Sequence, residues 1–183
     1  MQALNLIVFG APGSGVSTVC QNLSKTFNFH YVTLRNKCQP PDSGDPLPLE
    51  NQEFEKLKQQ LQKTKGYLID GSPCLLDLNL RDLDGIIYVT TPRIERLKRI
   101  REREVTAQGE KILKEGCKEF KVFNRYMYWI SQFDQAGIDR ESKILHEKFL
   151  NSTSVPTLRA NGLLNEEDLI QQTIDWINGL GKD

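Results

Sequence analysis

Short hydrophobic runs alternate with helical stretches along most of the chain. Five runs have the length and apolar content of buried strands, and they cover residues 4–9, 29–34, 67–70, 85–90 and 155–160. Helical patterns cover residues 17–27, 50–63, 92 to about 103 or beyond, and 165–180. Strands that alternate with helices predict an α/β fold with a doubly wound parallel sheet.

The remaining segments complete a single domain. Residues 39–49 contain four of the eight prolines and are predicted to form a loop. Residues 104–150 are mostly helical by pattern, with breaks at Gly116 and Gly137. A chain of 183 residues has the size of one domain with a substantial core, so we expect one domain over 1–183.

A glycine-rich stretch, GAPGSGVST at residues 10–18, follows the first predicted strand. It meets the phosphate-binding pattern G-x-x-x-x-G-K-[ST] at Gly10, Gly15 and Ser17, but Val16 stands where the pattern has lysine. Such a loop directs successive amide groups at one anion at a helix N-terminus. The predicted binding residues are Gly10, Gly13, Ser14, Gly15, Val16, Ser17 and Thr18. A glycine-rich turn without a ligand is the alternative.

The valine at position 16 removes a positive charge from this loop. Losing one charge-assisted hydrogen bond costs the bound state about 1.5–3 kcal/mol. Losing a group aimed at developing charge costs about 100- to 1,000-fold in rate. The backbone amides are therefore expected to hold a nucleotide while turnover collapses, unless another cation reaches the site.

The order of motifs resembles the adenylate kinase group of nucleoside monophosphate kinases. Residues 10–15 match the family's GAPGSGK loop up to its lysine, and residues 66–73 (GYLIDGSP) resemble its GFLLDGFPR segment. Residues 84–103 resemble a family stretch in which a strand is followed by proline and then R-L-x-x-R. The resemblance implies a three-layer P-loop kinase fold with a five-stranded parallel sheet, helices on both faces and a lid-like helical insertion at about 104–150.

The resemblance also implies roles for individual residues. Asp70 would orient Mg²⁺ through water together with the Ser17 hydroxyl, and ATP with Mg²⁺ would be the cofactor. Asp70 could instead cap the turn that follows its strand. Arg35, just after the second predicted strand, would bind the acceptor phosphate, and an ordinary surface arginine is the alternative.

Two departures from the family pattern bear on phosphate chemistry. Cys74 replaces the arginine that follows Gly-Phe-Pro in the family, which removes one clamp on the acceptor phosphate. The segment at residues 33–36 is shorter than the family's S-T-G-D-x-x-R, which puts specificity for adenosine monophosphate in doubt. No zinc-type lid pattern is present, and the four cysteines lack the clustered spacing of a structural zinc site.

An arginine run follows Pro92. On a helix, Arg96, Arg99 and Arg103 fall on one face at i, i+3 and i+7, where they could converge on phosphates as a lid does. Interleaved glutamates allow a solvated helix with surface ion pairs instead. The resemblance favours the lid role for Arg99 and Arg103, which become candidate catalytic residues with Asp70.

Other side chains are predicted to be structural. The aromatic residues Tyr126, Tyr128, Trp129 and Phe133 favour core or a helix–helix seam over a base-stacking platform. His146 is expected at the surface.

Composition limits the partners. The chain has 24 basic and 24 acidic residues, so zero net charge argues against nucleic acid or anionic membrane as the main partner. No apolar run approaches the length of a membrane span, and no secretory signal is apparent. The scattered cysteines indicate reduced thiols, so an intracellular protein is expected.

Two functions remain open at this point. The first is a catalytically impaired or inactive nucleotide-binding protein, kept as a nucleotide sensor or as a scaffold subunit of a larger assembly. The second is an active ATP-dependent kinase of a nucleoside monophosphate or other small molecule, whose catalytic charge comes from another residue. A nucleic-acid-binding module is disfavoured by the balanced charge.

Overall fold

The structure is a computed structural model that describes residues 3–34, 51–64, 66–72 and 83–180. The strands are β1 (Asn5–Gly10), β2 (His30–Thr33), β3 (Tyr67–Asp70), β4 (Gly85–Thr90) and β5 (Thr157–Asn161). The helices are α1 (Val16–Phe27), α2 (Asn51–Gln62), α3 (Arg93–Gln108), the 3₁₀ turn η3 (Glu110–Leu113), α4 (Lys118–Ser131), α5 (Lys143–Asn151) and α6 (Glu166–Gly179).

The five strands form one parallel sheet in the order β2-β3-β1-β4-β5. The predicted strands are all present, with bounds shifted by one or two residues, and the predicted fold class is confirmed. The chain leaves β1 toward β2 and β3 and then crosses to β4 and β5 on the other side. The carboxyl end of β1 is thus a topological switch point, the place where open α/β sheets bind ligands.

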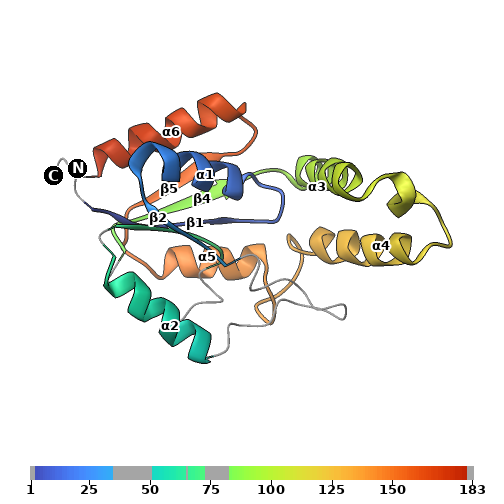
Figure 1. Cartoon of the computed structure of the whole chain (residues 1–183), viewed down its shortest axis with the longest axis horizontal. Coiled ribbons are helices and arrows are strands. Elements are labelled where there is room, and N and C mark those ends of the chain that lie inside the picture. Colours follow the sequence, from blue (N-terminus) through green and yellow to red (C-terminus); the bar gives the residue numbers. More distant parts are fainter. Residues whose placement is uncertain (1–2, 35–50, 65, 73–82, 181–183) are drawn as a thin grey trace.

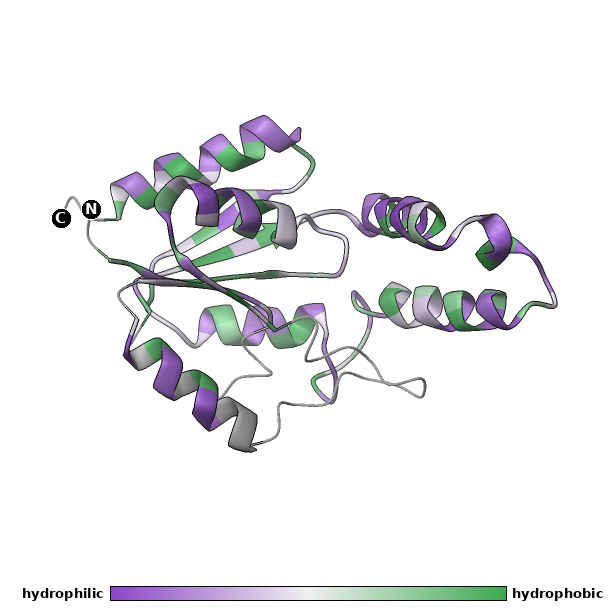
Figure 2. Cartoon of the chain, in the orientation of Figure 1, coloured by the Kyte–Doolittle hydropathy of each residue, from purple (hydrophilic) through white to green (hydrophobic). Residues whose placement is uncertain are grey.

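Helices cover both faces of the sheet (Figure 1). α1 and α6 lie on one face, and α2 and α5 lie on the other. Alternate residues of β1 point to opposite faces, so that Leu6 and Val8 join one apolar cluster while Ile7 and Phe9 join the other. Figure 2 shows that hydrophobic residues concentrate in the strands and on the helix faces toward them.

Helices α3 and α4 form an arm that extends beyond the carboxyl edge of the sheet and returns to it (Figure 1). α3 ends at Gly109, whose φ of 80° favours glycine, and η3 and a turn at Gly116 connect it to α4. Within the predicted helical stretch 104–150, α5 leaves the arm and packs against the sheet through Phe149 and Leu150.

The C-terminal helix begins as its sequence predicts. The Asn165 side chain accepts a hydrogen bond of 2.9 Å from the Asp168 amide, which makes Asn165 the N-cap of α6. Leu169, Thr173 and Ile177 are the buried residues of α6. Among the described residues, none of the helices combines the length and the apolar character needed to cross a membrane.

Candidate nucleotide-binding site

The glycine-rich stretch forms a loop between β1 and α1 at the switch point of the sheet. Gly13 (φ 82°) and Gly15 (φ 106°) adopt left-handed conformations that other residues rarely take. Gly15 caps α1 without a side-chain hydrogen bond, and the first turn of α1 contains no acidic residue. The first amides of a helix have no intrahelical acceptor, so this helix end offers its N–H groups and its positive dipole to an anion.

Hydrogen bonds hold the carbonyl groups of the loop against the protein. The Thr91 hydroxyl donates to the Ser14 carbonyl at 3.0 Å, and the Arg96 Nη1 donates to the Pro12 carbonyl at 3.3 Å. The loop also packs closely on its neighbours: a Cβ on Gly162 would lie only 2.6 Å from the Ser14 carbonyl oxygen. These contacts fix the loop from the side of β4, α3 and the β5–α6 connection.

Val16 occupies the lysine position of the loop as a core residue. Its side chain is 1% exposed and belongs to the apolar cluster that contains Val8 and Val19. One of its methyl groups lies 3.3 Å from where a Cβ on Gly10 would stand, so it packs directly under the loop. Position 16 therefore contributes only its backbone to the polar chemistry of the loop.

Asp70 meets Ser17 where β3 ends beside the loop. The Ser17 hydroxyl donates to Asp70 Oδ2 at 3.0 Å, and the Tyr31 hydroxyl donates to the same oxygen at 3.1 Å. Asp70 is fully buried. Burial and the nearby Asp70 carboxylate raise the pKa of Tyr31 well above its ordinary value, so the phenol stays protonated and keeps donating.

Ser17 and Asp70 fit a magnesium ion of the kind that kinases use. Mg²⁺ prefers oxygen ligands and is usually held by one or two carboxylates together with substrate phosphates and water, without an all-protein cage. Within the described part of the chain, no group of three or more His, Cys, Asp or Glu side chains gathers to form such a cage. A serine oxygen beside one buried carboxylate at the phosphate loop has the donor chemistry for the first arrangement.

A cleft with a volume of about 340 Å³ lies beside the loop. It is enclosed by the first turn of α1, by α3 and by the connection from β5 to α6. Its lining residues are Gly13, Gly15, Val16, Ser17, Thr18, Arg99, Ile100, Arg103, Gly162, Leu164, Glu166 and Leu169. The structure thus brings the predicted residues Arg99 and Arg103 to the predicted loop, although they are separated by about 80 positions in the sequence.

Both arginines of the cleft are engaged in local pairs. Arg99 donates from Nε to Glu95 at 2.9 Å, one helical turn away. Arg103 donates from Nη2 to Glu104 at 2.6 Å and to the Tyr126 hydroxyl at 3.2 Å. Arg99 and Arg103 are 35% and 53% exposed, so these pairs are screened by solvent and weak enough to exchange for a phosphate.

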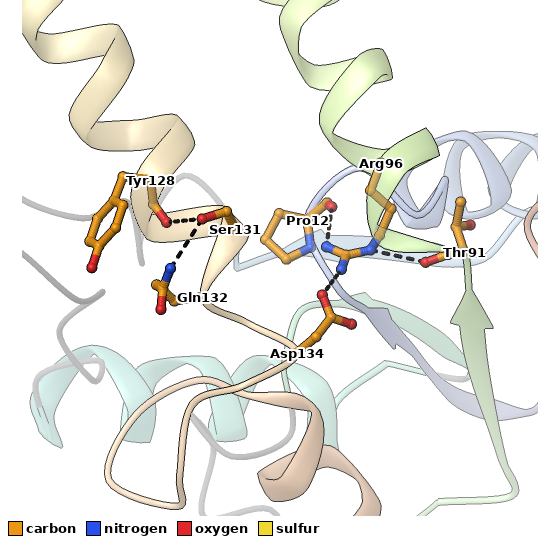
Figure 3. Close-up of polar contacts among 7 residues, drawn as sticks. All are labelled: Pro12, Thr91, Arg96, Tyr128, Ser131, Gln132 and Asp134. Carbon is orange, nitrogen blue, oxygen red and sulfur yellow. Dashed lines mark hydrogen bonds and ion pairs between the residues drawn. The ribbon is translucent and has the colours of Figure 1, made fainter.

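Arg96 does not join the other two arginines: of the three that could converge on phosphates, only Arg99 and Arg103 line the cleft. The Arg96 side chain is fully buried and donates to Thr91, Pro12 and Asp134 (Figure 3). The spacing of the three arginines does not reveal this difference, because the acceptors of Arg96 belong to segments outside α3.

The structure also corrects two expectations about aromatic and histidine residues. Tyr128 is 68% exposed, whereas Phe133 is buried, so the predicted aromatic cluster does not form one core. His146 is fully buried: its Nε2 lies 2.5 Å from Glu141 Oε1 and 3.4 Å from Ser72 Oγ, and three aromatic rings surround it.

Several predicted features remain outside the described residues. Arg35 and Cys74, the two positions that bear on the acceptor phosphate, fall in undescribed segments, as does Cys38. Cys20 is buried and Cys117 is partly exposed, and neither of these two described cysteines is in a disulfide.

Comparison with known proteins places the fold among kinases. No family model matches the chain. It is 25% identical to the uncharacterized protein YqaC of Bacillus subtilis, over 95% of this chain and 97% of that protein. It is 26% identical to a cytidylate kinase of Thermococcus kodakarensis, over 81% and 79% of the two chains. An adenylate kinase of Streptococcus suis is also 26% identical, over 95% and 98%.

Solved structures agree with the sequence comparison. A deoxyadenosine kinase from M. mycoides with bound dATP superimposes with a TM-score of 0.55 at 14% identity, over 96% of this chain and all of that one. A gluconokinase from Sinorhizobium meliloti superimposes with a TM-score of 0.56 at 11% identity, over 99% and 95%. With the parallel sheet and the phosphate-binding loop, these likenesses establish that the chain has a P-loop kinase fold similar to that of the nucleoside monophosphate kinases.

Proposed function

We propose that this protein binds ATP with Mg²⁺ at the phosphate loop but is catalytically impaired or inactive, and that it serves as a nucleotide-binding or scaffold subunit. The observation that carries the proposal is the contrast at the loop itself. Its backbone has the glycine conformations and the open helix end of an anion site, whereas position 16 is a valine that is 1% exposed. The first feature supports binding of an anion, and the second feature lacks the charge that would strengthen this binding and on which the rate depends.

The described residues divide the work of nucleotide binding. The amides of residues 13–18 would hold the β- and γ-phosphates, and the Thr18 side chain stands at the same edge of the cleft. Ser17 and Asp70 would orient Mg²⁺ through water, and the bound ion would neutralise phosphate charge. The arm of α3 and α4 would serve as the lid of a single domain, with Arg99 and Arg103 directed at the phosphates.

The two cleft arginines favour a second candidate, an active kinase. Both line the same cleft as Ser17, and their ion pairs are partly exposed, so a bound triphosphate could replace Glu95 and Glu104 as their partner. Arginine makes strong bidentate contacts with phosphate. In that case the arm would supply the charge that the loop lacks, to transfer the γ-phosphoryl group to a nucleoside monophosphate or another small acceptor.

Titration of Mg-ATP by calorimetry, with the native chain and with Val16→Lys, tests both candidates. A lysine that gains one charge-assisted hydrogen bond should tighten binding roughly 10- to 150-fold, from about 1.5–3 kcal/mol. Turnover with a panel of nucleoside monophosphates should rise about 100- to 1,000-fold from a negligible native rate. Val122→Lys is the matched control, because it adds the same charge at a half-exposed position of α4.

Three results would separate the possibilities. Native binding that strengthens with Val16→Lys, together with negligible native turnover, supports the impaired protein. Native turnover with magnesium dependence, and no gain from the lysine, supports the active kinase. Failure of the native chain to bind Mg-ATP at millimolar concentration, without rescue by the lysine, contradicts both.

A further inference from the structure

Arg96 is the largest fully buried side chain of the described residues, and its charge lies in the interior of the protein. Burying a guanidinium costs several kcal/mol unless its donors are satisfied in good geometry. The guanidinium meets this demand in three directions (Figure 3). Nε donates to the Thr91 carbonyl at 3.0 Å, Nη1 donates to the Pro12 carbonyl at 3.3 Å, and Nη2 forms an ion pair with Asp134.

The three acceptors belong to three separate parts of the site. Pro12 lies in the phosphate loop, Thr91 lies where β4 passes into α3, and Asp134 follows the end of α4. The Phe133 ring lies 5.4 Å from the guanidinium carbon and closes the remaining side. One side chain therefore connects the start of the arm before α3, the end of the arm after α4, and the phosphate loop.

The contact with the loop sets the direction of a backbone group. Because the Pro12 carbonyl accepts from Arg96, it is held toward α3. Gly13 follows against the same helix, where a Cβ would lie 2.7 Å from the Arg96 carbonyl oxygen. The next turns of α3 carry Arg99 and Arg103 into the cleft. A shift of the loop relative to the arm would therefore disturb the contacts at Arg96.

We propose that Arg96 is a positioning residue that fixes the phosphate loop and the arm relative to each other, so that the loop amides and the two cleft arginines can address one triphosphate. The part concerning affinity rests on the nucleotide binding proposed above. The part concerning geometry does not, because it can be measured without a ligand. Neither the loop motif nor the lid arginines assign this role, since Arg96 would not touch the nucleotide.

The test uses Arg96→Gln, Arg96→Lys and a matched control, Arg101→Gln, which removes one charge from an exposed position of the same helix. Amide hydrogen exchange of the free proteins should speed up at least about tenfold in Arg96→Gln at two places. The first is the Ser14 amide, which donates to the Ala11 carbonyl inside the loop, and the second is the hydrogen-bonded amides of Gln132, Phe133 and Gln135 after α4. Exchange in β1 and β4 should change by less than about twofold, as in the control.

The lysine variant separates geometry from charge. A lysine ammonium keeps the charge but lacks the planar fork that reaches three fixed acceptors. We therefore expect Arg96→Lys to retain most of the fast exchange of Arg96→Gln, and both variants to weaken Mg-ATP binding about tenfold or more. Full rescue by lysine of both exchange and affinity would show that only the buried charge matters and would overturn the proposal.

Two further results bear on it. Unchanged exchange at the Ser14 amide, or an equal increase throughout the sheet, would overturn a positioning role whether or not the native chain binds ATP. Where Arg96→Gln fails to fold, Asp134→Asn gives the second measurement, because it weakens the ion pair and keeps the arginine. That variant should speed exchange at residues 132–135 about tenfold, and no change there would count against the proposal.

Discussion

Replacing Gly13 by alanine adds one methyl group at the point where the phosphate loop touches α3. The added Cβ would lie 2.7 Å from the Arg96 carbonyl oxygen and 2.9 Å from Ile100 Cδ1. The backbone oxygen is part of a helix and cannot move aside alone. The residue would also have to adopt a φ of 82°, which L side chains rarely take.

The expected loss of stability has two parts. A left-handed conformation costs a non-glycine residue about 1–2 kcal/mol. Overpacking against fixed neighbours costs about 1–3 kcal/mol more. The smaller entropy of the unfolded alanine chain returns about 0.4–1 kcal/mol. Gly116 provides the matched control: its φ is 89°, but a Cβ there would meet nothing within 4 Å, so Gly116→Ala carries the cost of the backbone conformation and the entropy gain without the overpacking.

Urea unfolding of the native chain and of the two variants measures the difference directly. We expect Gly13→Ala to lower the free energy of unfolding by about 1–3 kcal/mol more than Gly116→Ala, which is the packing contribution alone. In thermal unfolding this corresponds to a gap of roughly 2–12 °C for a chain of this size. Equal losses for the two variants would refute the close contact between loop and helix, and with it the mechanical link between them.

Two other substitutions probe polar pairs. Tyr31→Phe removes a hydrogen bond of 3.1 Å to the Asp70 carboxylate and should cost about 1.5–3 kcal/mol in urea unfolding, whereas Tyr128→Phe, on an exposed ring, should cost less than about 0.5 kcal/mol; similar losses would contradict the assignment. Glu147→Gln tests a pH dependence, because hydrogen bonds from Arg159 at 2.9 and 2.6 Å lower the pKa of Glu147. A depressed folded-state pKa stabilises the protein above the unfolded value of about 4.3, and this stability is lost as pH falls through the folded value. The native chain should therefore exceed the variant by up to about 1 kcal/mol at pH 7, and the gap should close in acid; a gap independent of pH would contradict the pairing.

Much of the fold could be predicted because each strand has its own local signal. The β1 and β4 strands are continuous apolar runs, as strands buried on both faces must be, and the glycine loop and the Asn165 cap mark where helices begin. The end of α3 was less predictable. The charged sequence of α3 has no regular spacing of apolar residues whose end would mark the end of the helix. The helix continues to Gln108, five residues beyond Arg103.

The site was predictable to the extent that motif positions determine it. The loop, Ser17 and Asp70 come together because the carboxyl ends of β1 and β3 lie at one edge of a parallel sheet. Tyr31 and His146 were missed because their partners lie 39 and five positions away, in contacts that follow from register and helix packing. A buried His146 could have been inferred from apolar neighbours such as Phe149 and Leu150 on the same short helix.

Arg96 shows why one sequence pattern can hold two different roles. Arg96, Arg99 and Arg103 have the same residue type and lie on one face of α3. The first turn of α3 lies beside the loop, however, and only the later turns lie beside the cleft. The first arginine therefore meets backbone carbonyls and Asp134, and the later two line the cleft and pair with residues of the arm. A cation at the first turn can stabilise the shape of the loop without facing the side on which an anion would bind. Loop shape and the charge that faces a phosphate are thus separate properties in this chain, so Val16 can remove the second and leave the first intact.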